Sequence, residues 1–573
     1  MTIPAQDWQI RAAEKRESIL ARIPNEWKLA PEDLEKAKRQ RDMTGVVRDH
    51  LEATEASILA TKDASNIVGY IKDGIYSALQ VTTAFCKAAA IAHQIGNCLH
   101  EIFFDQALER AKALDAHFEE TGTVCGPLHG LPISLKDQFH VKGVDTTMGY
   151  VGWIGSNLGI KDPKDAHNIE SQITAELLSQ GAVLYCKTSL PQTLLFGETK
   201  NNIIGETLNP HNRNLSCGGS SGGEGALQAL GASVLGVGTD IGGSVRIPAA
   251  FNGIFSLKPT PERLSYRDVA NTNPGQNTYR STVGFMSTSV AGLELALRAT
   301  LSTKPWERDP AVVPIPFRQE IFDEYQSRAS GDGTASSKPL KLGILWTDRA
   351  VGPHPPIIRG LQEVADALTA AGHKVVDWDP PIQAIAKRVH VSFLLADGGH
   401  DIHSHLALSG EPLIPDLEEH FQLKPPMDLL EYQDLTLQGL DYEAAYSDYW
   451  NSTSQGDGQI VDAVIMPVAP HAAVIPGKYY HTAYTEVINL MNYSAAVVPV
   501  TKADKAIDIV PDGDDAYDPL NDVDKRNWEA YDPEIYDGAP VGVQIVARKF
   551  EEEKILAIAG IVTACLKRGA TQN

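Results

Sequence analysis

Short apolar runs alternate with helical stretches over most of the chain, from about residue 120 onward. The apolar runs, each bounded by Gly, Pro or Asp, include PLHGLPISLKDQF, GAVLYCKTSL, ASVLGVGTD, KLGILWTD and HKVVDWD. Stretches such as ESQITAELLSQ and PIIRGLQEVADALTAAG carry apolar residues at spacings of three and four, which is typical of a helix with one buried face. The alternation predicts an α/β fold in which helices cover a central sheet.

The first part of the chain has a different pattern. From Asp7 to about Glu119 the helical spacing dominates, so we expect helices throughout, including the long stretch VTTAFCKAAAIAHQIGNCLHEIFFDQALERAKALDAHFEE. Two later segments interrupt the alternation. Residues 306–337 are polar and contain Pro and Gly, which predicts a connection over the surface. Residues 502–537 are rich in acidic side chains and lie between strand-like runs, which predicts a solvated insertion that joins two core strands.

Charge and cysteine content limit the partners that the chain can have. The formal net charge of −23 disfavours a nucleic-acid surface, which needs concentrated Lys and Arg, and also docking on an anionic membrane. No run of about 20 apolar residues is present and the N-terminus has no apolar signal segment. The six cysteines are scattered without a CxxC pair, which suits reduced thiols. We therefore expect a cytoplasmic protein.

Two glycine-rich motifs match familiar chemistry only in part. Residues 218–222 formally fit the GxSxG nucleophile elbow, but that elbow needs an apolar strand directly before it and here NPHNRNLSC precedes it. GVGTDIGG misses the third glycine of the dinucleotide-binding GxGxxG, because Ile241 stands there. Cys217 beside the glycines could be a nucleophile, although a small buried filler is the favoured interpretation.

A histidine-rich stretch is the one candidate for metal binding. HDIHSH contains His400, His403 and His405, with Asp397 and Asp401 alongside. These residue types can bind a metal, but such a cluster in a polar stretch is more often part of a surface helix or loop. We expect no metal and no cofactor.

Residues 215–244, LSCGGSSGGEGALQALGASVLGVGTDIGGS, set two serine-bearing glycine turns at the ends of a helix and a strand. Ser220 precedes the helix, whose first turn a serine hydroxyl would cap. Gly242 and Gly243 let consecutive backbone N–H groups point into one concavity, which can hold an anion. The hydroxyl of Ser244 could attack a carbonyl whose oxygen the same N–H groups then bind. A serine that merely caps a helix after a glycine turn fits equally well.

A serine nucleophile needs a base, and Lys136 is a candidate. It stands near the end of the apolar run GLPISLKDQF, where a charged side chain is unusual. Lysine can act as a base if burial lowers its pKa from about 10.4 towards 7, a shift worth roughly 4 kcal/mol. A lysine that extends its amine into water fits the spacing as well, so both interpretations stay open.

Three blocks carry a resemblance to a known family. GPLHGLPISLKDQF, SCGGSSGGEGALQALGASVLGVGTDIGGSVRIPAAFNGIFSLKPT and GAPVGVQIVA resemble the amidase signature family of serine hydrolases. The likeness runs from about residue 60 to 565, and PNEWKLAPED, SLKDQFHVKG and NPHNRNLSCGG resemble the branch of fungal acetamidase-type general amidases. Mammalian fatty-acid amide hydrolase shares the serine blocks but belongs to a membrane-bound branch.

The resemblance implies a fold and a catalytic triad. The fold is α/β, with a central mixed sheet of about eleven strands surrounded by helices. The triad is Ser–cis-Ser–Lys, carried over here to Lys136 of the SLKD block, Ser220 of GGSSGG and Ser244 of GTDIGGS. Asp240 and Arg246 flank the nucleophile closely enough that we expect a structural ion pair between them.

The same resemblance assigns roles to these groups. Neutral Lys136 draws a proton through Ser220 while Ser244 attacks the amide carbon, and an acyl-enzyme forms. Ser221 is expected to hydrogen-bond Lys136 or to cap the following helix.

The resemblance also implies substrate-binding backbone. The oxyanion hole is carried over to the backbone of Ile241, Gly242, Gly243 and Ser244, and the carbonyl of Leu194 is expected to face the serines.

The expected function is hydrolysis of small carboxamides to carboxylate and ammonia, without a cofactor. A carbamate (urethane) hydrolase would use the same groups, and a lipid-amide hydrolase would want a membrane-entry helix that the sequence does not suggest. An ammonia-releasing amidotransferase subunit in a tRNA-bound complex is disfavoured by the net charge of −23. A homodimer is common among members of the family.

The expected domain organisation follows the likeness. Residues 1–60 form an N-terminal helical extension and residues 61–565 form the catalytic domain. Besides the two interrupting segments, a helical insertion is expected at about residues 385–455.

Overall fold

The computed structural model describes residues 7–156, 168–329, 338–511 and 517–570, and its centre is one mixed sheet of 11 strands. In spatial order the strands are β1 (Leu99–Ile102), β3 (Val183–Thr188), β2 (Pro132–Lys136), β6 (Leu235–Asp240), β8 (Thr282–Ser287), β7 (Phe255–Lys258), β12 (Ser494–Lys502), β13 (Pro540–Ala547), β11 (Ala463–Pro467), β9 (Lys341–Ile344) and β10 (Lys374–Asp377). Strand β2 runs parallel to both β3 and β6, whereas β6 pairs with β8 in antiparallel fashion. The predicted mixed α/β sheet is confirmed.

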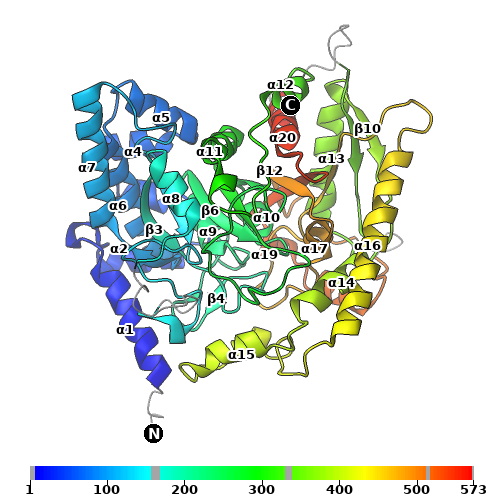
Figure 1. Ribbon diagram of the computed structural model, residues 1–573, viewed down its shortest axis with the longest axis horizontal. Coiled ribbons are helices and arrows are strands. Elements are labelled where there is room, and N and C mark those ends of the chain that lie inside the picture. Colours follow the sequence, from blue (N-terminus) through cyan, green and yellow to red (C-terminus); the bar gives the residue numbers. More distant parts are fainter. Residues whose placement is uncertain (1–6, 157–167, 330–337, 512–516, 571–573) are drawn as a thin grey trace.

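Helices surround this sheet (Figure 1). The first group, drawn in blue on the side of the sheet where β3 lies, is α1 (Asp7–Ala21), α2 (Pro31–Arg39), α3 (Val46–Asp49), α4 (Ala53–Ala60), α5 (Ala64–Lys72), α6 (Ala78–Gly96) and α7 (Phe104–Thr121). The second group is α8 (Gln172–Ser179), α9 (Gly222–Ala229), α10 (Arg246–Asn252), α11 (Val290–Ser302), α12 (Gln319–Gln326), α13 (Pro355–Ala370) and α20 (Glu552–Ala570). The third group is α14 (Gln383–Leu394), α15 (His400–Ala407), α16 (Leu429–Ser452), α17 (Ala483–Leu490), α18 (Asp522–Glu529) and α19 (Pro533–Tyr536). Among the residues described, no helix combines the length and the apolar content that a membrane span requires.

Strand β1 corrects the expectation of helices throughout the first part of the chain. Helix α6 ends at Gly96 and is capped by Asn97, which takes the left-handed conformation at φ 53°; Leu99–Ile102 then pair with β3 as an edge strand. All four strand residues are buried. Pairing with a strand that is distant in sequence decides the conformation of these four residues. The sequence does not reveal this strand, because the apolar spacing of three and four that is typical of a helix continues through α7.

The described residues before position 61 carry helices α1 to α4, and they share a core with the rest of the chain. Ala12 and Ile19 of α1 belong to the same buried cluster as the sheet residues Ile133 and Val237. Lys15 of α1 is itself buried and forms an ion pair with Glu101 of β1. The extension therefore packs as part of the main body.

The three expected segments differ in character. Residues 385–455 contain most of α14 and all of α15 and α16. Residues 306–337 include helix α12, which packs against α20, so the described part of this segment is more than a surface connection; 330–337 lie outside the described residues. Residues 502–537 do join two neighbouring antiparallel strands, β12 and β13, and carry α18 and α19, with 512–516 outside the described residues.

Candidate active site

Lys136 is the last residue of β2, in the interior of the sheet. Every residue of this strand is buried, and Lys136 itself is 0% exposed. Its Nζ lies 2.7 Å from Oγ of Ser220 and 3.0 Å from Oγ1 of Thr239 on the neighbouring strand β6. The amine is therefore held between two hydroxyl groups, away from water, and the interpretation of a lysine extending into solvent is excluded.

Burial determines the proton affinity of this amine. Removal from water lowers the pKa of Lys136 from 10.5 to about 7, although the negative charges of Asp240 and Glu224 oppose the shift. A large fraction of the amine is therefore neutral at neutral pH. A neutral amine 2.7 Å from the Ser220 hydroxyl can accept its proton.

A second hydrogen-bonded chain fixes the other side of the lysine. Oγ1 of Thr239 donates to Oε1 of Gln138 at 2.6 Å, and Nε2 of Gln138 donates to the carbonyl of Ala270 at 2.7 Å. Sequence reasoning missed Thr239 and Gln138 as part of this site. Thr239 stands in GTDIGG directly before Asp240, and Gln138 stands in SLKDQF two residues after Lys136, so both lie inside motifs that the sequence analysis considered.

Ser220 lies at the turn before α9, after a cis peptide bond between Gly219 and Ser220. A β-carbon at position 219 would lie 2.5 Å from the carbonyl oxygen of Glu198, so only glycine fits there. The backbone N–H of Ser221 donates to the carbonyl of Ser244 at 3.0 Å. This bond joins the two serine-bearing turns, although they lie at opposite ends of the α9–β6 unit.

The prediction for the side chain of Ser221 is wrong. Its Oγ lies 3.5 Å from the carbonyl oxygen of Thr239, and it makes no side-chain cap on α9. The lysine amine is already held by Ser220 and Thr239, so Ser221 contributes through its backbone.

Ser244 follows β6 in a tightly curled loop that precedes α10. Asp240 accepts from the N–H of Gly243 at 2.9 Å and of Val245 at 3.1 Å, and it forms the predicted ion pair with Arg246 at 3.0 Å. Burial raises the pKa of Asp240, but the charge of Arg246 and several hydrogen bonds outweigh it and hold that pKa well below its usual range. The carboxylate therefore stays ionised and holds the loop around Ser244 in shape.

Several backbone N–H groups of this loop have no hydrogen-bond acceptor among the described residues. The N–H of Gly243 is engaged by Asp240, whereas within the described part of the chain the amides of Ile241, Gly242 and Ser244 donate to no protein acceptor. Gly243 has φ 129°, and a β-carbon there would lie 2.4 Å from Oγ1 of Thr485, so the curl requires glycine. Three of the four predicted backbone positions thus keep a free donor.

The loop that contains Leu194 packs beside the Ser220 turn. Thr193 and Leu194 both have positive φ, 72° and 66°, which non-glycine residues adopt only where the surroundings enforce it. The same loop places the carbonyl of Phe196 so close to Gly219 that a β-carbon there would lie 2.7 Å from it. Leu194 is 4% exposed. This loop and the two serine turns therefore form one compact region.

The surroundings of Cys217 and of the HDIHSH stretch favour a structural role for both. Sγ of Cys217 is buried and donates to the carbonyl of Thr207 at 2.9 Å, and burial raises the pKa of the thiol above its usual range. It therefore stays protonated and is a poor nucleophile. The HDIHSH stretch forms helix α15, in which His403 contacts the carbonyl of Phe421 at 2.7 Å. His405 accepts from Nε1 of Trp153 at 3.1 Å, and no metal-binding group of three ligand-type side chains is found in the described ranges.

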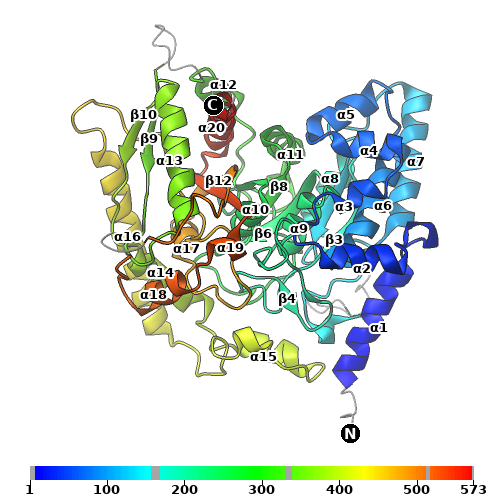
Figure 2. The same ribbon diagram turned by 180° about the vertical axis from the view of Figure 1, so that it is seen from behind.

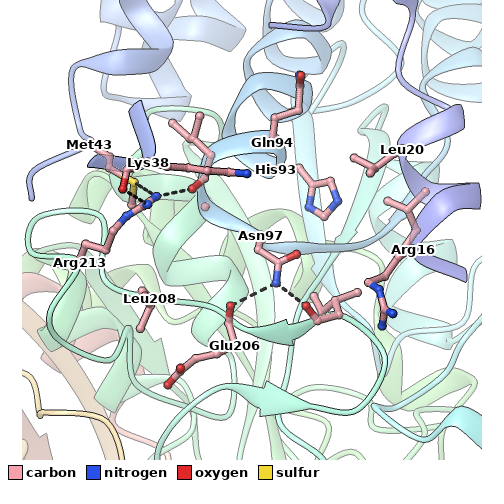
Figure 3. Close-up of a pocket in the computed structure, with 14 residues that line it drawn as sticks. Arg16, Leu20, Lys38, Met43, His93, Gln94, Asn97, Glu206, Leu208 and Arg213 are labelled. Atoms are coloured by element: carbon pink, nitrogen blue, oxygen red, sulfur yellow. Dashed lines mark hydrogen bonds between the residues drawn. The ribbon is translucent and has the colours of Figure 1, made fainter. Parts of the chain in front are cut away.

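A cavity of about 430 Å³ lies elsewhere, between α1, α2, α6 and the short strand β5 (Gly205–Glu206) (Figure 3). Its arginines are bound by backbone carbonyls: Arg213 donates to Ile95, and Arg16 to Ile203. Asn97 likewise donates to the carbonyl of Glu206. None of Lys136, Ser220 and Ser244 lines this cavity, which lies where the N-terminal helices meet the main body.

Comparison with known proteins shows which family the chain belongs to. The family model Amidase matches residues 80–556. An acetamidase of Aspergillus oryzae is 41% identical over 563 residues, covering 98% of this chain and 99% of its own, and an acetamidase of Emericella nidulans is 41% identical with 97% of each chain covered. The solved structure of a fatty acid amide hydrolase superposes with a TM-score of 0.87 at 30% identity, covering 98% of this chain and 95% of that one. The chain therefore belongs to the amidase signature family and is an amide-hydrolysing enzyme.

Proposed function

We propose that this enzyme hydrolyses small carboxamides to carboxylate and ammonia through an acyl-enzyme, with Ser244 as nucleophile, Ser220 as proton relay and Lys136 as base. One observation carries the proposal. A fully buried lysine with a pKa of about 7 lies 2.7 Å from a serine hydroxyl, and the turn of that serine is hydrogen-bonded to the turn that bears Ser244.

The forward step moves two protons along the relay and forms one bond, between the Ser244 oxygen and the amide carbon. Neutral Lys136 accepts the proton of Ser220, and Ser220 accepts that of Ser244 while the Ser244 oxygen attacks the amide carbon. The oxyanion receives hydrogen bonds from the amides of Ile241, Gly242 and Ser244, which are preorganised because Asp240 holds their loop.

The breakdown steps reverse the proton path. Ser220 gives its proton to the substrate nitrogen and regains one from Lys136, so that the C–N bond breaks, ammonia leaves, the Ser244 ester remains and the lysine is neutral again. Water then attacks this ester while the same relay takes its proton, which releases the carboxylate and restores the Ser244 hydroxyl. The carbonyl of Leu194, in its enforced backbone conformation, is proposed to orient the two serine hydroxyls.

The size of the substrate is inferred from the relatives. Two relatives at 41% identity are named acetamidases, whereas the structure at 30% identity is named for fatty acid amides. These names favour a short acyl group. The carbamate and amidotransferase alternatives gain no support, because none of these three relatives is named for either activity.

A hydrolysis screen tests the proposal. Ammonia release from acetamide, butyramide, hexanamide, benzamide and oleamide, and hydrolysis of ethyl carbamate, would be compared at equal enzyme concentration. We expect the highest kcat/KM among the short aliphatic amides. A highest kcat/KM for ethyl carbamate or oleamide would contradict the proposed substrate class.

Activity on acetamide is expected to survive exhaustive treatment with EDTA to within about twofold, because the proposed base and nucleophile are side chains of the chain itself. The imidazole of His403 is engaged by the carbonyl of Phe421, so His403→Ala should also be nearly neutral. Activity before and after chelation is the measurement. A loss that only added zinc restores would contradict this prediction.

A further inference from the structure

Helix α17 is fastened to the loop that bears Ser244. Oγ1 of Thr485 donates to the carbonyl of Gly242 at 2.6 Å, and Nη2 of Arg246 donates to the carbonyl of Thr485 at 3.1 Å. One turn further, Nδ2 of Asn489 donates to Asp240 at 2.9 Å. Helix α14 packs alongside α17 (Figure 2). A side chain in the first turn of α17 therefore has a fixed position relative to this loop.

Glu486 stands in that first turn, and the proposed mechanism does not use it. The residue is 7% exposed, and its Oε2 has no hydrogen-bond partner among the described residues. Burial raises the pKa of its carboxyl to about 7, although the positive charge of Lys387 on α14 and a hydrogen bond with the side chain of Thr482 oppose the shift. Buried carboxylate oxygens without a partner are rare, because such a group loses its water without compensation.

The carboxyl lies against the proposed oxyanion-binding loop. A β-carbon at position 242 would lie 3.7 Å from Cγ of Glu486 and 4.0 Å from its Oε1. Cε1 of His390 would lie 3.8 Å from the same point, and burial lowers the pKa of His390 to about 4, so this ring is neutral at pH 7. His390 therefore offers no positive charge to the Glu486 carboxylate. The Glu486 carboxyl therefore borders the loop that carries the free amides of Ile241, Gly242 and Ser244.

A second polar atom without a partner in the described ranges, the hydroxyl oxygen of Tyr479, belongs to a side chain that the charge of Glu486 influences. The hydroxyl of Tyr479 is buried and has no partner in the described ranges. Burial, with the nearby charge of Glu486 adding to it, raises the pKa of Tyr479 above its usual range. The ring lies directly on the backbone of Gly197, in the loop that follows Leu194. Polar groups thus border the region between the two loops.

We propose that Glu486 is a specificity-determining residue, which accepts a hydrogen bond from a donor group of the bound amide and so selects short, polar amides over amides with a long apolar acyl chain. This inference rests on the proposed amide hydrolysis and deepens it by naming the substrate class. A short amide with its NH2 group, or the water that accompanies it, can satisfy Oε2. A long alkyl chain beside the carboxyl would keep water out and leave the acceptor unpaired.

The test compares two substrates on the same protein. For the wild type, Glu486→Gln and Glu486→Leu, kcat/KM would be measured for acetamide and for hexanamide. The ratio of the two values is independent of the fraction of enzyme that is folded. Glu486→Leu is expected to lower the acetamide-to-hexanamide ratio at least about tenfold, because it removes the acceptor and adds apolar surface. Glu486→Gln keeps an acceptor oxygen and should stay within about threefold of the wild-type ratio.

The control is Glu529→Leu, the same change on the exposed face of α18, which should leave the ratio unchanged. An unchanged ratio in Glu486→Leu, or an equal change in Glu486→Gln, would overturn the inference. Dissociation constants of both amides, measured by NMR on Ser244→Ala with and without Glu486→Leu, test it apart from turnover. Absence of any turnover in the wild type would instead count against the proposed function, while the binding ratio would still decide the role of Glu486.

Discussion

Replacing Ser244 by alanine is expected to lower kcat for acetamide at least about 10⁴-fold, because no other group can form the acyl bond. The fold should persist, since Ser244 is fixed through its backbone carbonyl, which accepts from the N–H of Ser221, and alanine keeps that bond. The measurement is steady-state ammonia release together with the circular dichroism spectrum of the variant.

Covalent labelling separates the nucleophile from other residues of the site. A fluorophosphonate or similar serine-directed reagent should modify Ser244 of the wild type, as located by mass spectrometry of its peptides. Cys217→Ala serves as the matched control and should keep its activity, because that thiol is protonated and hydrogen-bonded to a carbonyl. Label on Cys217 or Ser220, or substantial turnover by Ser244→Ala, would contradict the assignment.

Replacing Lys136 by alanine should lower kcat/KM by about 10²- to 10⁴-fold, which is the usual contribution of a positioned general base. The remaining rate should increase with hydroxide concentration, since water or hydroxide must then deprotonate the relay. Lys136→Arg should be no better, because a guanidinium does not lose its proton near neutrality and is too large for a fully buried position.

A stability measurement accompanies these variants. The pKa of Lys136 is lowered on folding from 10.5 to about 7, so the folded state binds fewer protons than the unfolded state between these two values. The stability of the wild type should therefore rise with pH across this window. The destabilisation that comes from burying the charged amine is fully present below about pH 7. Lys136→Met removes the buried amine, so at pH 6 we expect it to be at least as stable as the wild type although inactive. Urea unfolding of both proteins at pH 6 and pH 9 would check this. A large loss of stability in Lys136→Met would show that the lysine serves chiefly to hold the fold.

The amino-acid sequence predicts the strand that ends at Lys136 and both serine turns because each feature is local. An apolar run, a glycine pair and a helical stretch leave recognisable patterns within a few residues. The same patterns left the roles of Lys136 and Ser244 undecided between catalysis and structure, and the family resemblance assigned them. The structure then removes one alternative, since Lys136 is wholly buried beside Ser220.

Other features depend on contacts between distant segments. Strand β1 follows α6 within a helical pattern, and only pairing with β3 makes it a strand. Glu486 is more than 240 residues from Gly242 in the sequence, and only the packing of α17 brings them together. Thr239 joins the site because β6 lies next to β2 in the sheet. Such placements follow from the topology and cannot be read from local spacing.

The dependence of kcat/KM on pH tests the central claim most directly, namely that a neutral buried lysine drives the two serines. For the wild type acting on acetamide, kcat/KM should rise along a single ionisation with an apparent pKa near 7, which is the value that burial gives Lys136, and should reach a plateau at alkaline pH. In Lys136→Ala that plateau should be replaced by a continuing rise with hydroxide concentration. A wild-type kcat/KM that does not change between pH 5 and 9, or a Lys136→Arg enzyme with the wild-type rate and profile, would contradict the account and require a different base.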